Sequence, residues 1–177
     1  MTNKMERFTK EARHLLYTAQ TLAEEMNHEL ISPKHLLWAM TKVEAYDTFA
    51  ILEEFDIVDS KLSQFIKVKH PPYHQSISKI DLSAETKRFL ELSVYSARPY
   101  NHYRIDTVHL LLGLIRVKSA EISEIFAHFD VVDKDIAKLA QFYLADTHYP
   151  LTSFSETAPP KWLMTILSKL GLTVDKR

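Results

Sequence analysis

The chain has 177 residues, 46% of them hydrophobic, which is enough to bury the core of one globular domain of ordinary size. Its 22 Lys and Arg nearly balance its 23 Asp and Glu, and neither sign forms a long run, so neither nucleic acid nor a membrane surface is an expected partner. The absence of cysteine excludes disulfides, thiol nucleophiles and cysteine zinc sites, and it is compatible with a reducing cytoplasm.

The N-terminal residues 1–7 are polar and charged, and they lack the apolar core of a signal peptide. No stretch of roughly 18 apolar residues follows that could cross a bilayer. We therefore expect a soluble, non-secreted cytoplasmic protein.

A short signature occurs twice, and each residue of the second copy lies 74 positions after its equivalent in the first. The matching residues are Asn27, His28, Ile31, His35, Leu36 and Leu37 in the first copy, and Asn101, His102, Ile105, His109, Leu110 and Leu111 in the second. This internal repetition predicts two copies of one supersecondary unit.

The first segment of each copy is predicted to be a long amphipathic helix. Apolar residues between Phe8 and Met26 recur at the spacing of one helical face. Thr9 and Ser83 occupy equivalent positions where a hydroxyl can cap the first turn. Asparagine tolerates the left-handed conformation that closes a helix, so we expect these helices to end near Asn27 and Asn101.

Three shorter helices are predicted to follow in each copy. The second helices begin at Ser32 and Asp106, the third span roughly 46–55 and 120–129, and Asp59 and Asp133 cap the fourth. No alternation with a period of two indicates a strand. The predicted fold is therefore all-α, a duplicated four-helix repeat with pseudo-twofold symmetry and about eight helices. Residues 1–146 form the domain, with repeat one at about 8–68, repeat two at about 82–144, and a linker around Lys69 to Lys79 that contains Pro71 and Pro72.

Residues 147–177 are expected to form a linker and a short amphipathic C-terminal helix from Lys161 to Leu170. Its apolar face includes Trp162, Leu163, Ile166 and Leu167. An isolated helix of this length is marginal in water, so the face must dock either on its own domain or on a partner. The sequence leaves both alternatives open.

Glycine is scarce, since only Gly113 and Gly171 occur and both lie in apolar helical contexts. Phosphate-binding loops and nucleophile elbows need several glycines where the backbone turns sharply or approaches a ligand. Nucleotide hydrolysis is therefore not expected of this chain.

The repeated pattern resembles the Clp N-terminal domain, which precedes the ATPase rings of Clp-type unfoldases. Family members read G-H and then I-G-T-E-H-L-L-L-G-L. Here the first copy reads Asn27-His28 and then Ile31 to Met40, and the second reads Asn101-His102 and then Ile105 to Leu114. The resemblance covers about residues 8–144, and both repeats match in order and spacing.

The resemblance implies a non-catalytic module that binds proteins or peptides and needs no cofactor. No nucleotide-binding motif accompanies it, so the chain looks like a stand-alone Clp N-domain protein without the AAA+ ATPase modules. We expect an adaptor, accessory subunit or substrate-recognition element whose partners include a Clp ATPase or Clp peptidase. The alternative is a free-standing peptide-binding domain that has diverged from Clp-linked proteolysis.

Some family members recognise phosphoarginine through the Glu of the T-E-H segment, and the matching positions here are Lys34 and Val108. A lysine would repel a guanidinium, and a valine offers it no hydrogen-bond acceptor. We expect that this chain is not a phosphoarginine reader.

Four histidines at matching positions, His28, His35, His102 and His109, invite a metal-site hypothesis. The paired histidines are seven residues apart, and no carboxylate recurs beside both pairs at ligand spacing. We therefore expect structural hydrogen bonds and no metal, with His35 and His109 satisfying backbone groups near the helix starts.

Ser93, Asp106 and His109 could be assembled into a triad, but any helical protein of this size supplies such a set, so we expect no enzymatic activity.

Tyr95, Tyr100 and Tyr103 cluster at the end of the first helix of repeat two. Aromatic residues at helical spacing are more often core, but the neighbouring Arg98 and Arg104 suit a contact surface.

Overall fold

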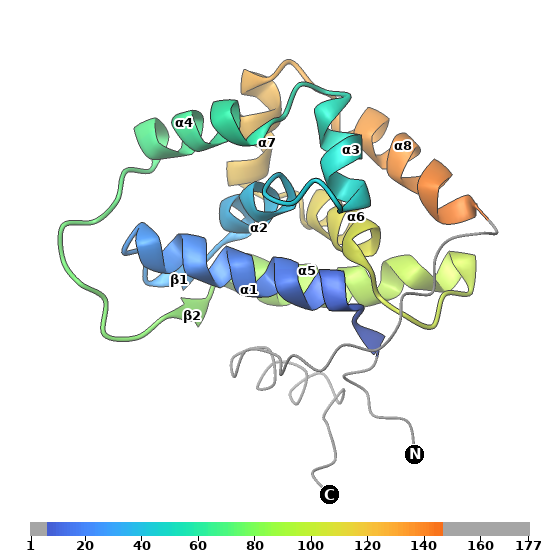
Figure 1. Ribbon diagram of the computed structural model, residues 1–177, viewed down its shortest axis with the longest axis horizontal. Helices are drawn as coiled ribbons and strands as arrows, with labels where there is room; N and C mark the ends of the chain where they lie inside the picture. Colours follow the sequence, from blue (N-terminus) through green and yellow to red (C-terminus); the bar gives the residue numbers. More distant parts are fainter. Residues whose placement is uncertain (1–6, 147–177) are drawn as a thin grey trace, which may run out of the picture.

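The computed structural model describes residues 7–146, and within this range it has eight α-helices in two sets of four (Figure 1). The first set is α1 (Lys10–Glu25), α2 (Pro33–Met40), α3 (Asp47–Glu53) and α4 (Asp59–Lys69), with a strand β1 (Leu30–Ile31) before α2. The second is β2 (Asp81–Leu82), α5 (Ala84–Ala97), a 3-10 helix η2 (Arg98–Tyr100), α6 (Thr107–Val117), α7 (Ala120–His128) and α8 (Asp133–Ala145). The predicted all-α duplicated fold is confirmed.

Equivalent local signals start and stop the long helices of the two repeats. The hydroxyls of Thr9 and Ser83 accept hydrogen bonds from amides in the first turns of α1 and α5, as predicted. Asn27 and Asn101 adopt left-handed conformations, with φ of 52° and 57°. Asparagine takes the role at these turns that glycine usually plays where a helix ends in a left-handed residue.

Two predicted caps are each wrong by one residue. Asp59 and Asp133 are the first residues of α4 and α8, and the preceding valines at the cap positions make no side-chain cap. Each carboxylate instead contacts another helix or turn. Asp59 Oδ1 accepts a hydrogen bond of 2.7 Å from Trp38 Nε1, and Asp133 pairs with Lys118 at 2.6 Å. Tertiary partners therefore outweigh the local capping preference at these two positions.

Short parallel strand pairings, which the sequence did not reveal, link the two repeats. In β1 and β2, Ile31 pairs with Leu82, and an isolated bridge joins Phe8 to Ile105. These two pairings are equivalent, because Ile105 and Leu82 lie 74 positions after Ile31 and Phe8. Each repeat thus sends the segment before its first helix to pair with the turn of the other repeat.

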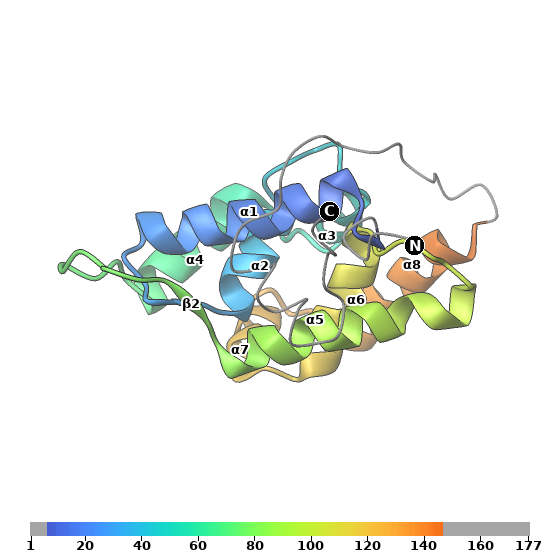
Figure 2. The same ribbon diagram turned by 90° about the horizontal axis from the view of Figure 1, so that it is seen from below.

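The core lies between the two long helices. Figure 2 shows α1 and α5 on opposite sides, with α2 and α6 between them. Every residue of α2 is buried, as is every residue of α6 from Thr107 to Ile115. Both helices are largely apolar, and helices that are buried on all sides lie in the interior of a domain. The duplicated His-Leu-Leu segments therefore form the centre of the molecule.

Gly113 permits the close packing of α6 on α5. A Cβ added to Gly113 would lie 2.8 Å from the Ser93 backbone nitrogen and 2.9 Å from its Cα, distances that real Cβ atoms do not tolerate. The Ser93 hydroxyl donates to the Phe89 carbonyl oxygen at 2.8 Å, so it is occupied within α5. Glycine at position 113 is therefore required by packing and not by a turn.

We predict that Gly113→Ala lowers the free energy of unfolding by about 1 to 3 kcal/mol, because the added methyl group must push α5 away from α6. Urea unfolding measures this change. The control is Ser123→Ala on the exposed face of α7, which should leave the midpoint within experimental error. Equal stability of Gly113→Ala and the wild type would contradict the close contact.

Candidate functional site

The first histidine pair forms a chain of hydrogen bonds that leads from α2 to the linker between the repeats. The Ser32 N–H donates to His35 Nδ1 at 3.0 Å, His35 Nε2 lies 2.9 Å from His28 Nδ1, and His28 Nε2 lies 3.1 Å from the Pro71 carbonyl oxygen. A carbonyl oxygen only accepts, so His28 donates through Nε2 and accepts from His35 through Nδ1. Both imidazoles are therefore neutral in this arrangement.

The second pair repeats this geometry. The Asp106 N–H donates to His109 Nδ1 at 2.9 Å, and His109 Nε2 lies 3.1 Å from His102 Nδ1. Burial lowers the pKa of His35 to about 2 and that of His109 to about 3. Between Arg7 and Asp146 the structure has no group of three or more His, Cys, Asp or Glu side chains placed to hold a metal ion. The described geometry gives these histidines a structural role at the helix starts.

We predict that acid destabilises the protein through His35 and His109. Both side chains are neutral in the folded state, whereas the unfolded chain binds protons below its ordinary pKa of 6.5, so stability is present above that pH and lost as pH falls. Each histidine should lower the free energy of unfolding by about 1.4 kcal/mol per pH unit below 6.5. The two together should lower it by about 2 to 3 kcal/mol between pH 7 and pH 5.5. Urea unfolding across this range measures the slope.

Two variants separate these histidines from other titrating groups. His109→Gln keeps a side-chain acceptor for the Asp106 N–H but cannot titrate, so it should lower stability at pH 7 and reduce the slope. His74→Asn changes an exposed side chain of the linker and should leave the slope as it is. A wild-type stability that is flat between pH 7 and pH 5.5 would refute the prediction.

Lys34, at the first phosphoarginine position, is buried in an ion pair between the repeats. Its Nζ lies 2.8 Å from Glu121 Oε1 and donates to Ser32 Oγ at 2.9 Å, and its backbone N–H donates to Glu121 Oε2 at 3.2 Å. Burial alone would raise the pKa of Glu121, but its hydrogen bonds with Lys34 and the lysine charge outweigh burial and lower that pKa. The lysine charge is therefore neutralised inside the protein, and Val108 at the second position is fully buried.

We predict that Glu121→Ala lowers the free energy of unfolding by about 3 kcal/mol, because it leaves the Lys34 ammonium buried without its counter-ion. The joint replacement Lys34→Met with Glu121→Leu removes both charges and should recover most of that loss. The control is Asp135→Ala, which breaks an exposed pair with Lys138 and should have almost no effect. If Glu121→Ala costs no more than Asp135→Ala, the pair does not stabilise the interior.

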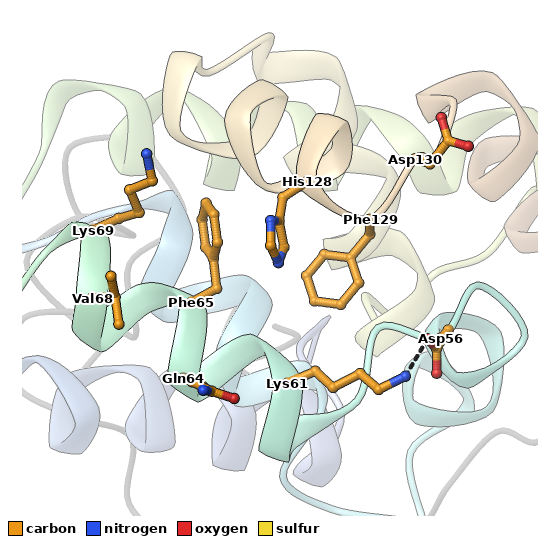
Figure 3. Close-up of a pocket in the computed structure, with 9 residues that line it drawn as sticks. All are labelled: Asp56, Lys61, Gln64, Phe65, Val68, Lys69, His128, Phe129 and Asp130. Carbon is orange, nitrogen blue, oxygen red and sulfur yellow. Dashed lines mark hydrogen bonds and ion pairs between the residues drawn. The ribbon is translucent and has the colours of Figure 1, made fainter.

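A cleft of about 580 Å³ lies between α4 and α7 (Figure 3). Phe65, His128 and Phe129 line it, and the ring centres of Phe65 and His128 lie 4.4 Å apart. Lys61 pairs with Asp56 at one end, and Lys69 pairs weakly with Glu124 near the other. The cleft can accept an apolar side chain, but its cations already have partners. No sequence pattern indicated this cleft, because its walls come from different repeats.

Two of the three tyrosines near the end of α5 are about half exposed. Tyr95 and Tyr103 have relative exposures of 50% and 51%, whereas Tyr100 is partly buried against the core. The Arg98 guanidinium lies 4.3 Å from the centre of the Tyr95 ring, and the Arg7 guanidinium lies 5.7 Å from that of Tyr103. Both distances are within the range of cation–π contacts, and both rings are about half exposed. We call these residues, together with Tyr100 and Arg104, the tyrosine–arginine surface.

Other predicted partner residues, Trp162, Leu163, Ile166 and Leu167, lie outside the described residues. None of the helices in residues 7–146 combines the length and apolar character needed to cross a bilayer.

The sequence model of the family described as the Clp repeat (R) N-terminal domain matches residues 7–139. The chain belongs to this family. The family domain thus includes both histidine pairs and the tyrosine–arginine surface.

Curated relatives of this Clp N-terminal domain include the ATP-binding subunit ClpC of the ATP-dependent Clp protease. The protein from Staphylococcus saprophyticus is 30% identical over 125 residues, and that from Staphylococcus aureus is 31% identical over 127 residues. Each match covers 71% of this chain and 15% of the relative. The chain therefore spans a small part of the length of these relatives.

Solved structures share the fold at lower sequence identity. The N-terminal domain of the chaperone ClpD from Arabidopsis thaliana aligns with a TM-score of 0.66 at 19% identity, covering 82% of this chain and 98% of that one. The Hsp104 N-terminal domain from Candida albicans aligns with a TM-score of 0.63 at 18% identity, covering 75% and 88%. At these identities the likeness shows the fold alone.

Proposed function

We propose that this chain is a non-catalytic protein- or peptide-binding module that acts as an adaptor, accessory subunit or substrate-recognition element for a Clp-type AAA+ unfoldase or protease. Residues 1–146 are the proposed binding domain, and residues 147–177 are the proposed linker and C-terminal helix. Membership of the Clp N-terminal domain family and the likeness to ClpC support the link to Clp machines.

The tyrosine–arginine surface is the observation that carries this proposal. Tyrosine and arginine are the residue types enriched at the energetic centres of protein interfaces. Tyr95 and Tyr103 expose about half of their surface, and both have an arginine stacked against them. The cleft between α4 and α7 is the weaker candidate, because Lys61 and Lys69 already have partners there.

Phosphoarginine recognition is disfavoured at both family positions. The Lys34 ammonium already binds Glu121, so a guanidinium would have to compete with an internal cation for that carboxylate. Val108 has no polar atom in its side chain and is fully buried. A free-standing peptide-binding domain without a Clp partner is the second candidate function, and it would use the same tyrosine–arginine surface.

The test is affinity purification of the tagged full chain from a lysate of its own cells at mild salt, with partners identified by mass spectrometry. We predict that Clp ATPase or Clp peptidase subunits are recovered, and that Tyr95→Ala with Tyr103→Ala reduces their recovery at least severalfold. The matched control replaces the equivalent residues of repeat one, as Thr21→Ala with Glu29→Ala. Thermal unfolding should show that all of these proteins keep the fold.

Each alternative to this proposal predicts a different result. Recovery of no Clp subunit above background would contradict the accessory role, and capture of one unrelated protein through the same tyrosines would favour the free-standing alternative. Clp recovery that survives the tyrosine variants but is lost after deletion of residues 161–177 would move the interface to the tail.

A further inference from the structure

The equivalent ends of α1 and α5 carry opposite charges. Residues 18–31 contain Glu24, Glu25 and Glu29 and no Lys or Arg, whereas residues 92–105, which lie 74 positions later, contain Arg98 and Arg104 and no Asp or Glu. Glu24 is the positional equivalent of Arg98, and Glu29 is that of Tyr103. The glutamates are all exposed, as is Arg98.

The same difference in charge occurs in the segment that precedes each long helix and pairs with the other repeat. Arg7 Nε donates to the Tyr103 carbonyl oxygen at 3.4 Å, whereas the N–H of its equivalent, Asp81, donates to the Glu29 carbonyl oxygen at 2.9 Å. The backbone neighbourhood is therefore similar at both ends, while the side chains differ in charge and in aromatic character. The two ends therefore differ in their side chains and not in their backbone fold.

Neither Arg7 nor Arg98 forms an ion pair with any residue between 7 and 146. The nearby Glu91 contacts Arg88 at 3.8 Å. Asp106 is buried and accepts hydrogen bonds from the Thr9 hydroxyl at 2.8 Å and the Thr107 N–H at 2.7 Å.

Stacking on tyrosine prepares these guanidinium groups for a ligand. A guanidinium that rests on an aromatic ring has its plane partly fixed, while its N–H edges remain available for bidentate hydrogen bonds to a carboxylate. Because less side-chain freedom is lost on binding, a contact with Arg98 costs less conformational entropy than one with a free arginine. The exposed tyrosine rings beside the guanidinium groups offer apolar contact area.

We infer that the tyrosine–arginine surface binds an acidic peptide segment of a partner protein, in which carboxylates meet Arg7 and Arg98 and an apolar side chain lies against Tyr95 or Tyr103. The inference rests on the proposed protein-binding function and adds the chemistry of the partner. It needs no contribution from the Clp machine itself.

A second copy of this chain is a less suitable occupant than a separate acidic segment. The acidic end of α1 is held by the linker, since Asn27 Nδ2 donates to the Tyr73 carbonyl oxygen at 3.1 Å and the Tyr73 N–H donates to the Met26 carbonyl oxygen at 3.0 Å. An extended peptide, by contrast, can place carboxylates and apolar groups in turn along one path.

The test is fluorescence anisotropy with the full chain and a short fluorescein-labelled peptide in which Glu and Asp alternate with Leu and Phe. We expect saturable binding that weakens as salt rises, and roughly tenfold weaker binding by Arg98→Ala. Arg98→Lys keeps the charge but loses the planar guanidinium, so its affinity should lie between those of the wild type and Arg98→Ala. The matched control Glu24→Ala, at the equivalent position of repeat one, should bind as the wild type does.

Several results would overturn the inference. They are an absence of saturable binding, equal binding of the same peptide with Lys in place of its acidic residues, and an affinity that Arg98→Ala leaves unchanged. Self-association of the wild type, abolished by both Arg98→Glu and Glu24→Arg and restored by mixing these two variants, would assign the surface to a second copy. Much tighter binding of a phosphoserine peptide than of the acidic peptide would assign it to phosphate.

The peptide-binding test and the Clp-capture test can give opposite results. Loss of peptide binding with Clp capture intact would reject the acidic partner and leave the accessory role standing. Peptide binding by a chain that captures no Clp subunit would retain the acidic partner and reject the accessory role.

Discussion

The exchange of backbone hydrogen bonds between the two repeats is the constraint on which the rest of the structure depends. The Thr9 N–H donates to the Ile105 carbonyl oxygen at 3.0 Å, and the Ser83 N–H donates to the Ile31 carbonyl oxygen at 3.0 Å. Each bond anchors the start of one long helix on the turn of the other repeat. Because these contacts close long loops, their entropic cost is recovered only when both repeats are folded. The duplicated halves therefore form one interlocked body with α2 and α6 at its centre.

The histidine pairs are a consequence of this geometry. The turns that accept the exchanged hydrogen bonds lead directly into α2 and α6, whose first amides need acceptors inside the core. Histidine supplies one acceptor nitrogen to Ser32 or Asp106 and still has a second ring nitrogen for the other histidine. An ionised glutamate at the same position could accept but could not donate onward, and it would place a charge in the core.

The two repeats have kept the same buried framework while their polar groups have diverged. Lys34 meets Glu121 across the interface, whereas the equivalent positions in the other half are Val108 and Asp47. Without such a lysine, burial and the neighbouring carboxylates of Asp106 and Glu11 raise the pKa of Asp47. On the outside, glutamates at the end of α1 correspond to arginine and tyrosine at the end of α5. A fold held by backbone hydrogen bonds and apolar packing tolerates such changes, so the two ends are free to acquire different ligands.

The sequence by itself determined the duplication, the eight helices and their stops at Asn27 and Asn101, because periodicity, caps and left-handed residues act over a few neighbouring positions. It misplaced the caps of α4 and α8, since Asp59 and Asp133 find partners outside their own helix starts. Only the tertiary structure decided the strand pairing, the cleft and the neutralisation of Lys34 by Glu121, which lies 87 residues away. It also decided that Tyr95 and Tyr103 face solvent. Each of these features depends on groups far apart in the chain, and local sequence patterns carry no information about which distant groups will meet.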